Sequence, residues 1–126
     1  DSACPSEVSV SKNTIKWFEE NNKNLTISDN FNDIAKNSDC IMTDTWISMG
    51  DKKDKSVDHF KPFQVNSNVM SLAKKDVIFM HCLPAYRGME VTDEVIDSKM
   101  SVVFDQAENR VHAQKSIIKH CCRDNY

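Results

Sequence analysis

Two short, uninterrupted apolar runs constrain the fold of this chain more than any other feature. The runs are Cys40–Thr43 and Val77–Met80. A strand with one face in water alternates apolar and polar residues, whereas a strand of a parallel sheet covered on both faces is apolar throughout. The stretches between the runs carry apolar residues at helical spacing. The chain is therefore predicted to adopt an α/β fold, in which a mostly parallel sheet is flanked by helices.

The same alternation of strands and helices is predicted along the rest of the chain. Further strands are expected at Leu25–Ile27 and Ser101–Phe104, and Ala3-Cys4-Pro5 is typical of the end of another strand. Helices are expected over residues 6–22, about 30–36, 53–60, 66–73 and 106–121, with a helical turn from residue 92. The Gly-rich phosphate loops of nucleotide-binding folds do not occur. We interpret residues 1–126 as one partial domain that lacks its first strand.

Charge, hydropathy and cysteine count exclude several classes of function. The net charge is -3 and the sequence pI is near 5.8, which argues against a general nucleic-acid binder, because phosphate contacts need a basic face. No apolar run reaches the length of a membrane span, and the first ten residues lack the pattern of a secretory signal. The five cysteines show no paired CxxC spacing, so free thiols are expected rather than a disulfide framework or a zinc site.

An acidic residue follows the first apolar run. Asp44 can bind a cationic ligand, or its side chain can cap the turn that comes next, and the residue type alone leaves both roles open. Trp46, two residues further on, is expected to anchor packing rather than to take part in chemistry.

A histidine and a cysteine follow the second run, in His81-Cys82-Leu83-Pro84. A thiol hydrolase is one interpretation, but neighbours on an extended chain point to opposite faces, so His81 cannot easily deprotonate Cys82. The alternative is a buried cysteine beside a rigid proline turn. The remaining histidines are expected on the surface or on helices, and nothing is spaced to complete a metal site.

An arginine lies near the start of the last predicted helix, in Glu108-Asn109-Arg110. The guanidinium group is always charged and offers a planar fork of donors, which suits carbonyl or phosphate oxygens. Arg110 can equally form a surface ion pair with Glu108 or Asp105. Taken alone, none of the three polar segments identifies a function.

Taken together, the three segments resemble the ornithine carbamoyltransferases. Asp44–Gly50, His81–Pro84 and Glu108–Arg110 occur in the order typical of that family, and Ala85–Val91 and Val103–Ala107 resemble its sequences as well. The family transfers a carbamoyl group from carbamoyl phosphate to the δ-amino group of L-ornithine, giving L-citrulline and phosphate, without a metal or an organic cofactor. The resemblance implies a two-domain subunit, a homotrimer and a cytoplasmic enzyme. This chain would be an incomplete, doubly wound second domain, which binds ornithine.

The resemblance also assigns roles to individual residues on the ornithine side. Asp44, Ser48 and Met49 are expected to bind the amino-acid end of ornithine, with the Asp44 carboxylate as the partner of the α-ammonium group. Cys82 is expected beside the δ-amino nitrogen, which must be neutral to attack and whose pKa a desolvating site would lower.

Other residues are expected on the carbamoyl phosphate side. The resemblance places His81, Cys82, Leu83 and Arg110 there, with backbone groups and the guanidinium group holding the carbamoyl oxygen. That oxygen gains negative charge as the tetrahedral intermediate forms, so preorganised donors lower the barrier. Asp44, Cys82 and Arg110 are thus the expected catalytic residues.

The chain also departs from the family pattern. The Ser-Thr-Arg-Thr-Arg phosphate loop and the His-Pro-x-Gln segment are absent, so we expect the chain alone to be inactive. The apolar face of the last helix (Val111, Ile117 and Ile118) is expected to be exposed. Two alternatives stay open: a carbamoyltransferase that acts on a related amine such as putrescine, and a non-catalytic binding or assembly module of the same fold.

Overall fold

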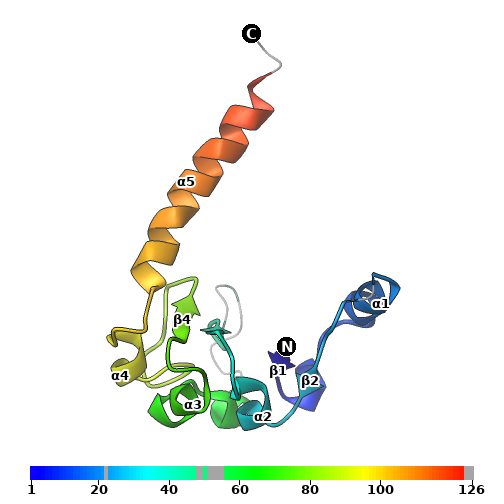
Figure 1. Cartoon of the computed structure of the whole chain (residues 1–126), viewed down its shortest axis with the longest axis vertical. Coiled ribbons are helices and arrows are strands. Elements are labelled where there is room, and N and C mark those ends of the chain that lie inside the picture. The colour runs from blue at the N-terminus through cyan, green and yellow to red at the C-terminus, as the bar shows by residue number, and fades with distance from the viewer. Residues whose placement is uncertain (22, 48–49, 51–55, 124–126) are drawn as a thin grey trace.

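The computed structural model describes residues 1–21, 23–47, 50 and 56–123, and within these ranges the chain is an α/β structure. Helices and strands alternate as predicted (Figure 1). The strands are β1 (Ser2–Ala3), β2 (Ile27–Ser28), β3 (Cys40–Thr43) and β4 (Ile78–His81). The helices are α1 (Lys12–Glu20), α2 (Phe31–Ala35), α3 (Ser67–Leu72), α4 (Asp93–Ile96) and α5 (Val103–Cys121), with 3-10 helices at Ser6–Val8 and Asp58–Phe63.

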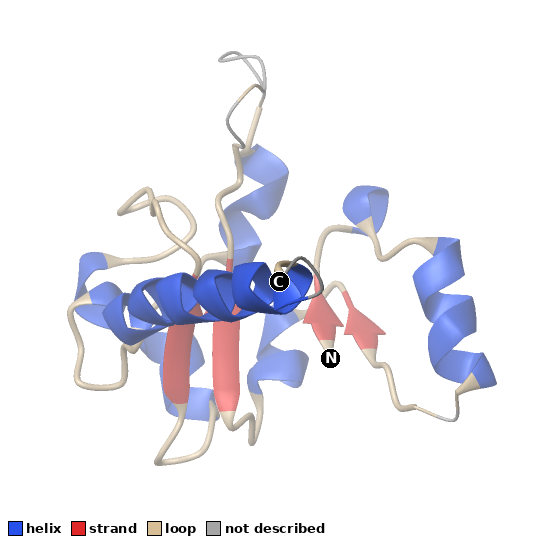
Figure 2. Ribbon diagram, turned by 90° about the horizontal axis from the view of Figure 1, so that it is seen from above, coloured by secondary structure: helices blue, strands red, loops and turns tan. Residues whose placement is uncertain are grey.

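The strands form two separate parallel pairs, which Figure 2 shows side by side. β1 pairs with β2, and β3 pairs with β4 in a register that runs from Cys40 opposite Ile78 to Thr43 opposite His81. A single parallel bridge between Phe79 and Ser101 borders β4 on its other side. The parallel sheet predicted from the apolar runs is therefore present, although in two pieces.

The hydrophobic core covers only one face of β3 and β4. Ile41 and Phe79 are buried there together with residues from α2, α3 and α4. The neighbouring side chains on the opposite face are exposed, Met42 by 59% and Ile78 by 38%. The expectation that the apolar run of β3 is covered on both faces is therefore wrong for the described residues. Side chains alternate along a strand, and the described helices bury only one set.

The predicted helix over residues 6–22 is two elements. The first is the 3-10 helix Ser6–Val8, and α1 begins only at Lys12. The side chain of Ser11 accepts a hydrogen bond from the backbone N–H of Thr14, which is the contact of a helix N-cap. The N-cap of the helix is therefore Ser11 and not Pro5. The prediction of one helix over residues 6–22 merged two elements that this N-cap separates.

Three other predicted boundaries differ from the structure. The strand expected at Ser101–Phe104 is wrong, because only Ser101 bridges to a strand and α5 already begins at Val103. The strand expected at Leu25–Ile27 lies later, at Ile27–Ser28. The helix expected over residues 53–60 falls partly outside the described residues, and the described part belongs to the 3-10 helix Asp58–Phe63.

Helix α5 projects from the rest of the molecule as a single rod (Figure 1). Of its 19 residues only Val103, at its first position, is buried. Val111, Ile117 and Ile118 are 48%, 61% and 62% exposed, which confirms the expected exposure of its apolar face. Neither α5 nor any other helix within the described ranges has the length and apolar character needed to cross a bilayer.

Candidate active site

The candidate site lies where β3 and β4 end. Thr43 and His81 are partners in the parallel register, so the next residue of each strand, Asp44 and Cys82, leaves the sheet at the same level. The carboxyl ends of parallel strands are where α/β proteins place ligands. The register alone therefore brings together two of the residues that the sequence singled out.

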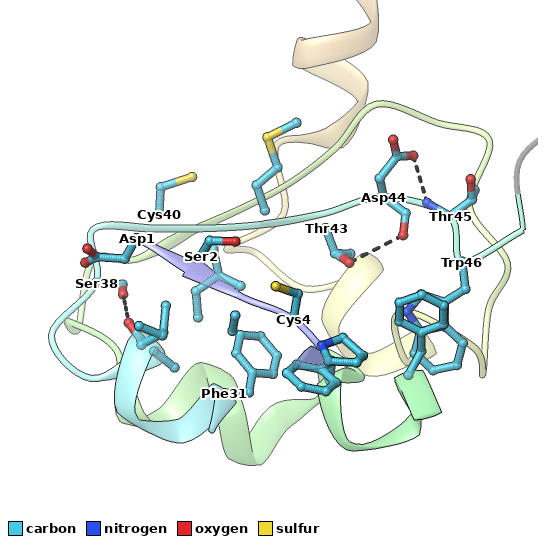
Figure 3. Close-up of a pocket in the computed structure, with 18 residues that line it drawn as sticks. Asp1, Ser2, Cys4, Phe31, Ser38, Cys40, Thr43, Asp44, Thr45 and Trp46 are labelled. Atoms are coloured by element: carbon cyan, nitrogen blue, oxygen red, sulfur yellow. Dashed lines mark hydrogen bonds between the residues drawn. The ribbon is translucent and has the colours of Figure 1, made fainter. Parts of the chain in front are cut away.

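Asp44 and Cys82 are joined by a hydrogen bond. The Cys82 thiol donates to Asp44 Oδ1 at 3.1 Å, and the backbone N–H of Thr45 donates to the same oxygen at 2.7 Å. The second contact is the local turn interaction that the sequence left open for Asp44 (Figure 3). No described residue bonds the other carboxylate oxygen, Oδ2, so the aspartate combines a structural contact with a charge available to a ligand.

The same hydrogen bond fixes the protonation of both groups. It is the main cause that lowers the pKa of the Asp44 carboxyl. It is also the main cause that raises the pKa of the Cys82 thiol, while the positive charge of Arg110 acts in the opposite direction. At neutral pH the site therefore holds a carboxylate beside a protonated thiol, which is not the thiolate that a cysteine nucleophile requires.

His81 points into the protein rather than toward Cys82. Its side chain is fully buried, whereas Cys82 is exposed, so the predicted opposite orientation of the two side chains is confirmed. The backbone N–H of Leu83 donates to His81 Nδ1 at 2.9 Å. Because Nδ1 accepts this bond, a neutral imidazole carries its proton on Nε2.

Glu90 is a buried partner of His81 that the sequence reasoning missed. Its side chain is 0% exposed, and Oε1 lies 3.3 Å from His81 Nε2. The backbone N–H of Tyr86 donates to the same oxygen at 2.6 Å. The sequence offered one indication that Glu90 is buried, namely its position between the apolar residues Met89 and Val91. The pair ties the end of β4 to the loop that follows it.

The backbone N–H of Leu83 is already engaged within the protein. Its backbone N–H is already bonded to His81, so the carbonyl oxygen is the group left for a ligand at this residue. Its φ of 53° is in the left-handed region, which is uncommon for a residue other than glycine. The peptide bond that joins Leu83 to Pro84 is cis.

Arg110 lies on α5, about two turns from its start, and its side chain is exposed. Its positive charge acts to lower the pKa of the Cys82 thiol, against the larger opposite effect of Asp44. Among the described residues it pairs with neither Glu108 nor Asp105; Glu108 instead lies 3.9 Å from His112. The predicted role of Arg110 in the site stays a prediction. Ser48 and Met49, the other predicted ornithine contacts, lie outside the described residues.

A cavity of about 340 Å³ adjoins this site and meets it at Asp44. Thr45 and Trp46 line the same end, and the Trp46 ring stacks on Phe60 with 5.9 Å between ring centroids, in agreement with its predicted packing role. Cys82 and Arg110 do not line the cavity (Figure 3). Within the described ranges, no group of three or more His, Cys, Asp or Glu side chains gathers in a way that could hold a metal ion.

Comparison with known proteins gives one consistent result. Residues 1–121 match the family model of the Asp/Orn binding domain of aspartate/ornithine carbamoyltransferase. An ornithine carbamoyltransferase of Rhodopseudomonas palustris is 52% identical over 120 residues, which are 94% of this chain and 39% of the relative. The enzyme of that name from Methanobrevibacter smithii is 50% identical over 124 residues, again 94% of this chain and 41% of the relative.

Solved structures show the same likeness. An ornithine carbamoyltransferase from Pyrococcus furiosus superimposes with a TM-score of 0.83 at 44% identity, over 93% of this chain and 39% of its own. The anabolic ornithine carbamoyltransferase from Campylobacter jejuni also gives 0.83, at 33% identity, over 98% of this chain and 42% of its own. The 126 residues thus span about two fifths of the length of these relatives.

Proposed function

Because this chain belongs to the aspartate/ornithine carbamoyltransferase family, as its Asp/Orn binding domain, we propose that it supplies the ornithine side of an ornithine carbamoyltransferase. The complete enzyme would transfer the carbamoyl group of carbamoyl phosphate to the δ-amino group of L-ornithine, giving L-citrulline and phosphate. The observation that carries the proposal is the Asp44–Cys82 pair at the ends of β3 and β4. Relatives about 50% identical to this chain are named ornithine carbamoyltransferase. This favours ornithine over aspartate as the substrate.

Asp44 is suited to bind the cationic end of ornithine. Its pKa is lowered, so it is ionised at neutral pH, and only Oδ1 is bonded by described residues. A carboxylate in this state attracts an ammonium group by charge and accepts its N–H donors. In this proposal Ser48 and Met49 complete the recognition of the amino-acid end.

The reaction itself needs a neutral amine and a stabilised oxyanion. The δ-amino nitrogen forms a bond to the carbamoyl carbon, the bond from that carbon to the phosphate oxygen breaks, and the departing phosphate takes the proton that the nitrogen loses. In this proposal the Arg110 guanidinium group stabilises the negative charge on the carbamoyl oxygen. The Cys82 sulfur accepts an N–H from the amine while its own proton is held toward Asp44. His81 positions Leu83 through the bond to its N–H.

The rest of the enzyme is part of the proposal as well. A carbamoyl-phosphate domain elsewhere in the polypeptide would supply the phosphate contacts, the complete protein would be a homotrimer, and it would work in the cytoplasm. The residues at hand need no metal ion or organic cofactor for this chemistry, because a guanidinium group and backbone donors can stabilise the developing charge.

Citrulline formation tests the proposal. This chain is mixed with a separately made amino-terminal half of the Rhodopseudomonas palustris relative, and citrulline is measured from ornithine and carbamoyl phosphate. The mixture is expected to be active and the chain alone inactive. Arg110→Ala should reduce the activity at least a hundredfold, by about the amount that loss of an oxyanion contact costs. Arg123→Ala, the same change near the end of α5, should leave it unchanged.

Two outcomes would overturn the proposal or redirect it. If the folded mixture makes no citrulline but binds ornithine, the chain is a binding module without catalysis. If it neither reacts with ornithine nor binds it, the assignment of the substrate is wrong. Competition by putrescine, which lacks the amino-acid end that Asp44 is proposed to bind, separates ornithine from simpler amines.

A further inference from the structure

Two fully buried polar side chains belong to the segment that contains Leu83. His81 ends β4, and Glu90 follows in the loop after it. Each side chain is 0% exposed. Burying a polar side chain costs free energy unless its polar atoms find partners, so the contacts of these two residues show what they hold in place.

One nitrogen of the His81 ring holds the backbone of Leu83. The N–H of Leu83 donates to Nδ1 at 2.9 Å. A ring nitrogen that accepts a hydrogen bond carries no proton, so this contact requires the neutral ring with its proton on Nε2. In the other neutral tautomer, Nδ1–H would face the N–H of Leu83. Two donors would then oppose each other, and the buried N–H would lose its acceptor.

The second ring nitrogen faces Glu90. His81 Nε2 lies 3.3 Å from Glu90 Oε1, and Nε2 forms no hydrogen bond to any described residue. The Glu90 oxygen is therefore the acceptor within reach of the Nε2 proton. The separation is slightly long for a hydrogen bond, as contacts in catalytic sites often are before substrates bind. An oxygen at this place still disfavours a ring without a proton on Nε2, because two acceptors would face each other.

Glu90 is itself attached to the core. Its Oε1 accepts the N–H of Tyr86 at 2.6 Å. Its backbone carbonyl oxygen accepts the N–H of Val65 at 2.9 Å, and the N–H of Thr92 donates to the carbonyl oxygen of Val65 at 3.0 Å. Val65 is 0% exposed, as is Val91 between the two bonded residues of the loop. The carboxyl group is therefore a fixed point against which the His81 ring is oriented.

We propose that Glu90 is a positioning residue of the catalytic site. Its Oε1 keeps the proton of the His81 ring on Nε2, and the ring then offers Nδ1 to the N–H of Leu83. This bond keeps Leu83 at a φ of 53°, which residues other than glycine seldom adopt without support. The inference rests on the proposed function, in which Leu83 lies on the carbamoyl phosphate side. Because both buried side chains are 0% exposed, they act through Leu83 and not by contact with a substrate.

Replacing Glu90 in the reconstituted mixture tests this role in the citrulline assay. Glu90→Leu removes both acceptor oxygens and keeps a side chain of similar size. It should lower kcat at least tenfold, because a displacement of about 1 Å in a catalytic site can cost roughly a hundredfold. The KM of ornithine should change by no more than about threefold, because Asp44 is untouched. Glu90→Gln keeps one oxygen and should retain kcat within about threefold.

A second background separates positioning from a merely structural role. In His81→Asn the amide oxygen is attached where Nδ1 was, so it can accept the Leu83 N–H, but no ring tautomer remains for Glu90 to select. Adding Glu90→Leu to His81→Asn should therefore change kcat by no more than about threefold. An equal loss of kcat in both backgrounds would overturn the proposal, because it would show that Glu90 acts on the fold alone.

Two matched controls accompany this double-mutant cycle. His81→Gln places its amide near the position of Nε2 and lacks the acceptor for Leu83. It should be at least tenfold slower than His81→Asn. Glu94→Leu is the same change as Glu90→Leu at an exposed position of α4, and it should leave kcat unchanged.

The tautomer of His81 is a readout that does not depend on turnover. Histidine labelled with nitrogen-15 is introduced into this chain only, and the His81 signals are identified by their loss in His81→Asn. Nuclear magnetic resonance should find the proton on Nε2 in the parent and in Glu90→Gln, and a mixture of both tautomers in Glu90→Leu. A ring that stays entirely in the Nε2–H form in Glu90→Leu would overturn the proposal. This result is obtained whether or not the mixture makes citrulline, so it distinguishes a failure of the Glu90 role from a failure of the proposed function.

Discussion

The contact between Asp44 and Cys82 is set by strand register. The two residues follow Thr43 and His81, which are direct partners in the β3–β4 pair. A slip of one residue would turn every side chain of a strand to the other face, and it would separate the thiol from the carboxylate. The protonation of the site is therefore a consequence of the sheet and not only of the two residue types.

Replacing Asp44 by Asn is expected to make Cys82 more reactive. The hydrogen bond and charge of the carboxylate raise the pKa of the thiol, and Asn removes the charge while keeping a similar shape. The pKa of Cys82 should fall, so that alkylation at pH 8 becomes faster, because the thiolate is the reactive form. The measurement is the alkylation rate against pH, mapped to each cysteine by mass spectrometry. Cys121 is the internal control, and an unchanged profile at Cys82 would contradict the proposed coupling.

The sequence indicated the polar residues at the ends of the strands, but it did not indicate the buried Glu90. The contact between Asp44 and Cys82 could be anticipated because each residue directly follows an apolar strand, while the role of Arg110 stays a prediction. Glu90 could not, because its role depends on the position of His81, which lies nine residues earlier and is equally buried. No sequence spacing predicts that an acidic residue in a loop is buried. The burial of Glu90 is explained only by its tertiary contact with His81.

The loop after β4 is fastened at several points. The Gln64 side chain donates to the carbonyl oxygens of Gly88 and Met89 at 3.0 and 2.7 Å. Arg87 reaches Asp93 and Asp97 on α4 and beside it, at 2.8 and 2.6 Å. Gly88 has a φ of 79°, which glycine adopts without strain. These contacts explain how a segment without regular structure can hold Leu83 and Cys82 in place.

Removal of the Glu90 side chain is expected to destabilise this loop strongly. Glu90→Ala leaves the N–H of Tyr86 without its acceptor and removes the carboxyl oxygen that lies 3.3 Å from His81 Nε2, and leaving a buried polar group without a partner costs about 1–3 kcal/mol. The free energy of unfolding, measured with urea, should fall by about this amount. Glu19→Ala, at an exposed position of α1, is the control and should change it by no more than about 0.5 kcal/mol. A similar small change for Glu90→Ala would show that the pair contributes little.

Strands and helices could be predicted where the local sequence pattern favours the same structure as the tertiary packing. The apolar runs of β3 and β4 were found within one residue of their observed ends. The run Ser101–Phe104 was not, because β-branched Val102 and Val103 favour a strand, whereas the chain turns into α5 as soon as Val103 is buried. One bridge at Ser101 is all that remains of the expected strand.

Several large apolar side chains of the described residues are exposed. Trp17 on α1 is 53% exposed and Phe104 on α5 is 73% exposed. Phe104, Val111 and Ile118 are seven residues apart, so they lie along one side of α5. Large exposed apolar surfaces mark contacts with another protein or domain. The fold class was predictable from the sequence, whereas the exposure of these apolar faces depends on the tertiary structure.

The isolated chain is therefore expected to self-associate through this side of α5. Replacing Val111 and Ile118 together by Glu should lower the association measured by sedimentation velocity at high protein concentration, because the apolar contact is lost and like charges repel. Asn109→Glu with Ser116→Glu adds the same charge at the same spacing on another side of the helix and is the control. Equal effects of both double variants would attribute the change to net charge alone.

Helix α5 also acts as a lever. Its root, Val103, is buried and fixed against the core. At 1.5 Å per residue, Arg110 lies about 10 Å and Cys121 about 27 Å along the axis from that root. A tilt that shifts the tip by roughly 3 Å thus moves the base of the guanidinium arm by roughly 1 Å, and a misplacement of this size can change a rate about a hundredfold. Contacts at the distant tip can therefore change the distance between Arg110 and Cys82 without touching either residue.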